Sequence, residues 1–186
     1  ETGAVNNKQK ENKKIPTSQP IKDLSKILQI NRQAPKMWEV NHPKKDADKG
    51  RIVHEILSYI ETINDLDDAL KKALRLGLIA NSEVREMRST LNIVLKNVDM
   101  RPYFAQGLRV KNEEEILLSN GRILRPDRLI FKENEVIIID YKTGLENNTH
   151  KKQILEYKNE IENMGYKVKE CLFVYIKDES IKLKRV

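Results

Sequence analysis

The feature that most constrains the fold of this chain is the continuous apolar run Val136–Ile139. It is followed directly by the charged residue Asp140, and Lys142 comes two residues later. A strand that is apolar at every position is typical of the centre of a sheet covered on both faces. Side chains two apart on a strand point to the same face, so Asp140 and Lys142 are expected to emerge together. The preceding run, residues 125–131, is separated from this one by the polar residues 132–135. Together the two runs predict a hairpin.

Asp127 lies in the first strand of this hairpin, from which it can reach the same end of the sheet. Two acids and a lysine at the end of a buried strand are costly unless they are paired or bind a metal. Carboxylate oxygens are hard ligands suited to Mg²⁺ or Mn²⁺. Such a metal activates water and neutralises charge on a phosphate, with Lys142 beside it. The alternative is a surface salt bridge between Asp140 and Lys142, since Asp-x-Lys is frequent by chance.

Four short motifs follow one another between about residue 50 and residue 157. They are Gly50-Arg-Ile-Val-His54, Arg125-Pro-Asp127, Ile139-Asp-Tyr-Lys-Thr-Gly144 and Gln153-Ile-Leu-Glu-Tyr157. In this order they resemble the PD-(D/E)XK nuclease superfamily. The resemblance is strongest to the RecB/AddA-type nuclease domain found at the C-terminus of UvrD-like helicases.

This resemblance implies a fold and an activity. The fold would be α/β with a restriction-endonuclease-like core, a central mixed β-sheet flanked by helices in the order αβββαβ. The activity would be that of a Mg²⁺-dependent (or Mn²⁺-dependent) DNA nuclease, an exonuclease on single-stranded DNA in recombination and repair. Implied partners are DNA, an upstream helicase/ATPase domain in the same polypeptide and a second helicase–nuclease subunit.

The resemblance also assigns roles to the residues of the charged strand end. Asp127 and Asp140 would hold the metal, with His54 and the carbonyl of Tyr141 as further ligands. Lys142 would position the attacking water and offset charge on the phosphoryl group. From the residues alone, a lone histidine such as His54 is more simply explained as hydrogen-bonded at the rim of the core.

Two further segments match the helicase-linked nucleases. Residues 112–115 resemble their Asn-Glu-x-Glu segment, and of its acids Glu113 is chosen as the supporting residue, with Glu115 as the alternative. Gln153 and Tyr157 are four apart and therefore share a helix face. By resemblance, this face flanks the cleft and orients the scissile phosphate or the DNA strand. Otherwise, Tyr157 packs in the core and Gln153 faces solvent.

Composition narrows the class of protein. Lysine and arginine number 35 against 28 acids, a net charge of +7 that fits a polyanionic partner. The single cysteine, Cys171, excludes a disulfide framework and indicates a reducing compartment, here the cytoplasm. It also excludes the four-cysteine iron–sulfur cluster of some relatives. No apolar run approaches membrane-spanning length.

The order of the segments predicts one domain with a tether. Residues 1–20 are polar and read as a flexible linker, with a basic nucleic-acid-binding arm as the alternative. The nuclease domain would span residues 21–186, with a short helix over 21–30 and irregular chain over 33–45. The chain opens with Glu1 rather than methionine, which predicts an excised piece of a longer protein.

Within this domain a helical layer is expected over residues 46–97, followed by the catalytic sheet and helix over 108–186. Ser82 is a candidate N-cap of one helix. Residues 108–118 read as one strand, and Pro126 predicts a bulge or edge in the strand that follows. A helix is expected from about Thr149 to Met164.

Two other functions fit the same sequence. A binding module could retain the nuclease fold without catalysis, although the intact Asp127, Asp140 and Lys142 speak against it. A structure-specific or RNA-directed nuclease would carry the same motifs.

Overall fold

The structure is a computed structural model, and it describes residues 46–118, 120–177 and 180–186. The predictions for residues 1–45, namely the linker, the short helix and the irregular segment, lie outside the described residues.

A five-stranded sheet forms the centre of the described part of the chain. Its strands lie in the order β1 (Arg109–Asn112), β4 (Arg128–Lys132), β5 (Glu135–Lys142), β6 (Lys167–Ile176) and β7 (Ile181–Arg185). The β5–β6 pair is parallel and the other pairs are antiparallel, so the sheet is mixed. A separate small hairpin is made by β2 (Ile116–Leu117) and β3 (Ile123–Leu124).

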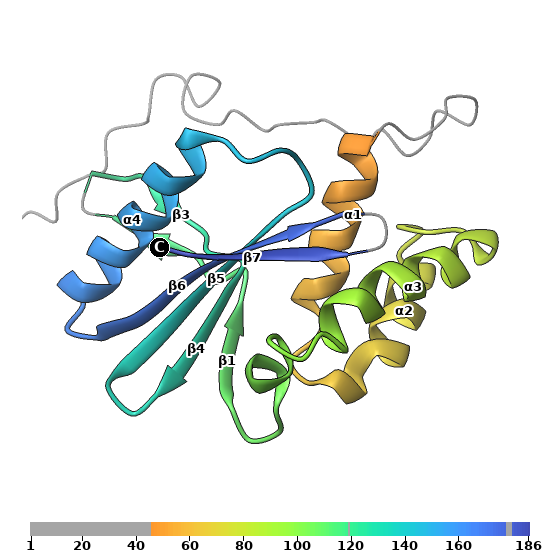
Figure 1. Cartoon of the computed structure of the whole chain (residues 1–186), viewed down its shortest axis with the longest axis horizontal. Coiled ribbons are helices and arrows are strands. Elements are labelled where there is room, and N and C mark those ends of the chain that lie inside the picture. Colours follow the sequence, from red (N-terminus) through yellow and green to blue (C-terminus); the bar gives the residue numbers. More distant parts are fainter. Residues whose placement is uncertain (1–45, 119, 178–179) are drawn as a thin grey trace, which may run out of the picture. The chain divides into compact units, whose positions relative to one another are not determined.

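Helices cover both faces of this sheet (Figure 1). One layer contains α1 (Asp46–Ser58), α2 (Leu66–Arg75) and α3 (Val84–Leu95), and α4 (Asn148–Asn163) packs on the opposite face. Within the described residues, short 3₁₀ turns connect or flank these helices, at Ile63–Asp65, Asn81–Glu83 and Arg101–Phe104. The expected α/β fold, with a mixed sheet between helices, is confirmed. Among the described helices, none combines the length and apolar character that crossing a bilayer needs.

The apolar run in β5 is explained by two hydrophobic cores. Ile137 and Ile139 belong to the core beneath α1, α2 and α3, whereas Val136 and Ile138 belong to the core beneath α4. Successive side chains of a strand point to opposite faces, so a strand covered on both faces must be apolar throughout. The same parity places Asp140 toward α4 and Tyr141 toward α1.

Helix α4 begins and ends where its flanking residues predict. The Asn147 side chain accepts a hydrogen bond from the backbone N–H of Thr149 at 3.1 Å, which satisfies a donor of the first turn. At the other end Gly165 adopts φ +91°, the left-handed conformation that glycine takes most readily after a helix. This helix carries Gln153 and Tyr157.

Three local predictions were wrong. The strand expected over residues 108–118 is two strands, because Glu113 adopts φ +52° and ends β1. Ser82 lies inside a 3₁₀ turn, and there the Glu83 carboxylate accepts from the Ala80 N–H instead. Pro126 needs no bulge, since β4 starts after it, at Arg128.

Candidate active site

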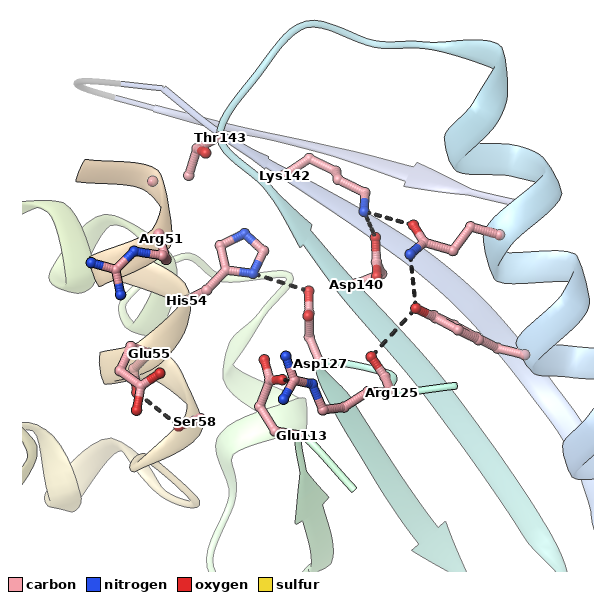
Figure 2. A pocket seen from close by; sticks show the side chains of 13 residues that line it. Arg51, His54, Glu55, Ser58, Glu113, Arg125, Asp127, Asp140, Lys142 and Thr143 are labelled. Atoms are coloured by element: carbon pink, nitrogen blue, oxygen red, sulfur yellow. Dashed lines mark hydrogen bonds and ion pairs between the residues drawn. The ribbon is translucent and has the colours of Figure 1, made fainter. Parts of the chain in front are cut away.

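A pocket of about 540 Å³ opens at the end of the sheet between α1 and α4 (Figure 2). Every motif that the sequence analysis singled out contributes to it. The residues that line it are Gly50, Arg51, His54, Glu55, Ser58, Glu113, Arg125, Asp127, Asp140, Lys142, Thr143, Gln153 and Tyr157.

Asp127 lies directly before β4, at the open end of the β4–β5 hairpin. Arg128 pairs with Ile139, so continuing the register by one step places Asp127 opposite Asp140. The Asp127 Oδ2 atom accepts a hydrogen bond from the Tyr141 backbone N–H at 2.6 Å. The same oxygen lies 3.4 Å from His54 Nδ1 on α1. Asp127 therefore joins the two central strands to the helix that carries the histidine.

Asp140 and Lys142 emerge together on the α4 side of β5. The Lys142 Nζ atom lies 2.5 Å from Asp140 Oδ2 and donates to Gln153 Oε1 at 3.0 Å. Gln153 Nε2 in turn donates to the Tyr157 hydroxyl at 2.8 Å, and that hydroxyl donates to the Arg125 carbonyl at 3.3 Å. Figure 2 shows this chain of contacts, which fixes the lysine between the strand and α4.

Burial makes ionisation of Asp140 unfavourable. The side chain is only 2% exposed, and burial together with the nearby Asp127 charge raises the pKa of the Asp140 carboxyl to about 6, against the opposing effects of Lys142 and His54. For His54, burial lowers the pKa, but the hydrogen bond and charge of Asp127 outweigh it and the net pKa is raised. Adjacent titratable groups with displaced pKa values are typical of functional sites.

Glu113 is brought into the pocket by the break after β1. Its carboxylate pairs with Arg125 Nε at 2.9 Å, and burial and the charge of Asp127 raise its pKa. Glu115 is exposed and does not line the pocket. The structure thus places the chosen acid, Glu113, beside Asp127, by way of a left-handed residue rather than a shared strand face.

The donor set fits a divalent cation. One ligand atom from each of His54, Glu113 and Asp127 lies within 4.8 Å of the other two. Asp140 lies outside this trio, yet its buried Oδ2, although in ion contact with Lys142, lacks a hydrogen-bond donor of good geometry. Two carboxylates and an imidazole suit Mn²⁺ or Mg²⁺, and an under-satisfied buried carboxylate oxygen is what a cation would stabilise.

Tyr141 contributes its backbone to the site while its side chain packs away from the pocket. Its ring is 2% exposed in the core beneath α1 and lies edge-on to the His54 ring, with centroids 6.1 Å apart. Its N–H is already used by Asp127. Its carbonyl oxygen as a metal ligand stays a prediction.

Gly50 allows α1 to approach the end of β5. A Cβ atom at position 50 would lie 2.2 Å from Thr143 Oγ1 and 3.1 Å from Thr143 Cβ. A side chain there would require Thr143 to change its position or α1 to move away from β5, and His54 lies one helical turn further along α1. The glycine of the first motif therefore has a packing explanation that is independent of the resemblance.

Arg128, which sequence reasoning missed, connects the supports of the site. It is fully buried and donates to the carbonyls of Ile60, Glu61 and Tyr103 at 2.7–2.8 Å, and to Asn112 Oδ1 at 3.1 Å. Its guanidinium lies over the Phe104 ring, 4.2 Å from the centroid. The only sequence signal was a cation directly before the apolar residues 129–131.

Among known proteins, this chain is similar to a family profile and to solved structures. No curated protein matches the chain. Among solved structures, the crystal structure of SSO0001 matches with 18% identity and a TM-score of 0.31, and the match covers 72% of this chain and 65% of that one. The chain thus spans less than two thirds of the length of that protein. The family profile described as the PD-(D/E)XK nuclease superfamily matches residues 24–166. The chain therefore belongs to the PD-(D/E)XK nuclease superfamily.

Proposed function

We propose that this chain hydrolyses phosphodiester bonds of DNA in a reaction that depends on Mg²⁺ or Mn²⁺. The observation that carries the proposal is the convergence in one pocket of the His54, Glu113 and Asp127 donor atoms with the Asp140–Lys142 pair. Carboxylates beside a lysine, at the end of a central strand, suit an attack by water on a phosphorus atom. Membership of the superfamily supports the same reaction.

The metal would be held by Asp127 and Asp140, with His54, Glu113 and the Tyr141 carbonyl as further ligands. When bound, it supplies a Lewis acid that lowers the pKa of coordinated water and neutralises charge on the phosphate. Burial already disfavours the ionised form of Asp140, so a cation offsets an electrostatic penalty in the protein itself.

Lys142 acts on the attacking water and the phosphoryl group. Contacts with Asp140 and Gln153 hold its ammonium at the pocket, so little side-chain freedom remains to be lost in the reaction. From there the ammonium donates a hydrogen bond to the water oxygen or to a non-bridging phosphate oxygen. Water attacks phosphorus and the 3′ oxygen leaves, which leaves a 5′ phosphate on the product. Tyr157 and Gln153 keep the lysine aligned and face the substrate strand.

The biological setting that we propose is a helicase–nuclease of recombination and repair, acting in the cytoplasm, in which this domain degrades single-stranded DNA from an end. The motifs Gly50–His54 and Gln153–Tyr157 support this, because both resemble the helicase-linked branch. The net charge of +7 supports a polyanionic substrate. The helicase domain and a second subunit would be the protein partners.

A substrate panel tests this proposal. The purified chain would be incubated with linear single-stranded, circular single-stranded and duplex DNA, and with RNA, in Mg²⁺, Mn²⁺ or EDTA. We expect cleavage of linear single strands with either metal, none in EDTA, no cleavage of circles, and products with 5′ phosphates. Cleavage of circles would replace the exonuclease with an endonuclease. Preference for RNA would establish the RNA-directed alternative. Binding without cleavage of any substrate would indicate a silent module.

A further inference from the structure

A second cavity adjoins the candidate active site. Its volume is about 350 Å³, and it shares Gly50 and Thr143 with the active-site pocket. The contact between α1 and the end of β5 thus forms a ridge with a cavity on each side. The second cavity extends from this ridge toward Thr90 of α3 and the end of β6.

The lining of this cavity differs from that of the active site. Val53 and Ile176, both almost fully buried, give it an apolar floor, and none of the described residues that line it carries a carboxylate. Lys49 and Lys177 provide cations at its rim. Leu145, on the loop after β5, is 86% exposed although it is a large apolar residue. An apolar floor with cations at the edge suits a ligand that is apolar on one part and anionic on another.

We propose that this cavity holds the nucleotide next to the scissile phosphate of a single strand. The base would pack against Leu145 and the apolar floor, and its phosphate would meet Lys177 and Lys49. The inference rests on the proposed function, which it deepens by assigning a subsite. Its volume lies within the roughly 300–1,000 Å³ typical of small-molecule sites.

Charge and connectivity favour a nucleic-acid strand over a separate small anion. The two cavities share Gly50 and Thr143 in their linings, so a strand that crosses this contact would reach both of them. Lys49 pairs with Glu86 at 2.7 Å, and the Glu86 side chain is 65% exposed. Exposed ion pairs contribute little to stability, so the Glu86 contact does little to hold Lys49 away from a phosphate. A base on aliphatic side chains gives contact without base-specific hydrogen bonds, as expected for a sequence-tolerant enzyme.

The test compares two substrates of different size. One is a single-stranded oligonucleotide, and the other is bis(p-nitrophenyl) phosphate, which is too small to cross the ridge. We expect Lys177→Glu and Leu145→Ser to lower kcat/KM for the oligonucleotide by about tenfold each. Hydrolysis of bis(p-nitrophenyl) phosphate should change by less than about twofold, because the chemistry lies on the other side of the ridge. Lys132→Glu is the matched charge control, because Lys132 lies at the end of β4 that is opposite to Asp127.

The outcomes separate this inference from the proposed function. Unchanged oligonucleotide kinetics in both variants, or an equal loss on both substrates, overturns the subsite. Failure of the wild-type chain to hydrolyse either substrate overturns the proposed function instead. In that case, anisotropy of a fluorescent single-stranded oligonucleotide in EDTA still tests the cavity. Weaker binding by Lys177→Glu than by Lys132→Glu supports the subsite, and equal binding overturns it.

Discussion

At the scale of single residues, the site combines groups that a stable fold alone would not select. Asp140 is buried, Lys142 is the one cation of the described residues that pairs with it, and its pKa is raised to about 6. Glu113 adopts a left-handed conformation that costs a non-glycine residue free energy. Both features carry an energetic penalty in the metal-free fold and place a carboxylate in the pocket, which is the pattern of a functional site.

Replacing Asp140 by asparagine is expected to stabilise the metal-free chain near neutral pH. A folded-state pKa of about 6, above the ordinary 3.8, means that ionising Asp140 destabilises the fold increasingly as the pH rises through this window, and fully above it. Asp140→Asn should therefore raise the free energy of unfolding by on the order of 2 kcal/mol near neutral pH, and by little near pH 4. Urea unfolding in EDTA at the two pH values measures this.

His54 also contributes to the pH dependence of stability in that experiment. Its raised pKa stabilises the fold at low pH, and this contribution is lost as the pH rises through the folded-state pKa. Both the wild type and Asp140→Asn retain His54 and its contact with Asp127, so most of this contribution cancels in the difference. The smaller part of the pKa increase, which comes from the Asp140 charge, is lost in the variant. Lower stability of Asp140→Asn near neutral pH would contradict the account.

Glu113 and Glu115 form a matched pair two residues apart. Glu113→Gln is expected to weaken Mn²⁺ binding by about 10–100-fold, because it removes one of the three converging ligand groups. Glu115→Gln, at an exposed position outside the pocket, should leave the affinity unchanged. Calorimetric titration of both variants with Mn²⁺ decides between the two acids. An equal affinity in Glu113→Gln and wild type would exclude Glu113 as a ligand.

At the scale of elements, the site depends on how closely α1 approaches β5. Gly50→Ala would raise helix propensity by about 1 kcal/mol, but its Cβ would collide with Thr143. We expect a net loss of about 1–3 kcal/mol in the free energy of unfolding. Thr143→Ala removes the nearest atom, so the double variant should recover most of this loss. Chemical denaturation of the four chains measures the coupling, and independent effects would contradict close packing here.

Arg128 also links several elements of the fold. It connects β4 and β1 to the chain segments after α1 and after α3 through four hydrogen bonds. Arg128→Met fills a similar volume but leaves two buried carbonyls and the part-buried Glu61 carbonyl without this donor, which should cost on the order of 3–5 kcal/mol. Arg128→Lys should recover only part, because a single ammonium cannot reach the same acceptors. Urea midpoints measure both variants. Wild-type stability in Arg128→Met would contradict the role.

Prediction from sequence succeeded where one local pattern decides the structure. The apolar run of β5 and the helix expected from about Thr149 to Met164 rest on local signals, and the structure contains both elements nearly where they were expected. The division of residues 108–118 could not be predicted, because the break occurs at Glu113, a residue type that seldom adopts positive φ. The role of Arg128 was also hidden, since its acceptors lie far away in the sequence.

At the scale of the whole described fold, the pocket lies where two layers meet the end of the sheet. His54 comes from α1 on one face, and Gln153 and Tyr157 come from α4 on the other. Asp140 comes from β5 between them, and Asp127 from the residue directly before β4. The motifs predicted this assembly in outline, because they resemble a known arrangement. Distances, the exclusion of Asp140 from the trio and the adjoining cavity required the folded chain.

Metal binding should stabilise the whole fold, because the ligands come from α1, from the segment after β1 and from the β4–β5 hairpin. A ligand that binds only the folded state adds about 2.7 kcal/mol at 100 times its dissociation constant. We expect Mn²⁺ to raise the Tm of the wild type, and to raise that of Asp127→Ala far less. Differential scanning fluorimetry measures this. An equal shift in both chains would place the metal elsewhere.

The most direct test of the central claim is single-turnover cleavage of end-labelled, linear single-stranded DNA in Mg²⁺ by the wild type, Lys142→Ala and the control Lys132→Ala. We predict cleavage by the wild type and by the control, abolition by EDTA, and a loss of at least about a hundredfold in Lys142→Ala with metal binding retained. Wild-type rates in Lys142→Ala, or cleavage that persists in EDTA, would contradict the assignment of this pocket as a metal-dependent nuclease site.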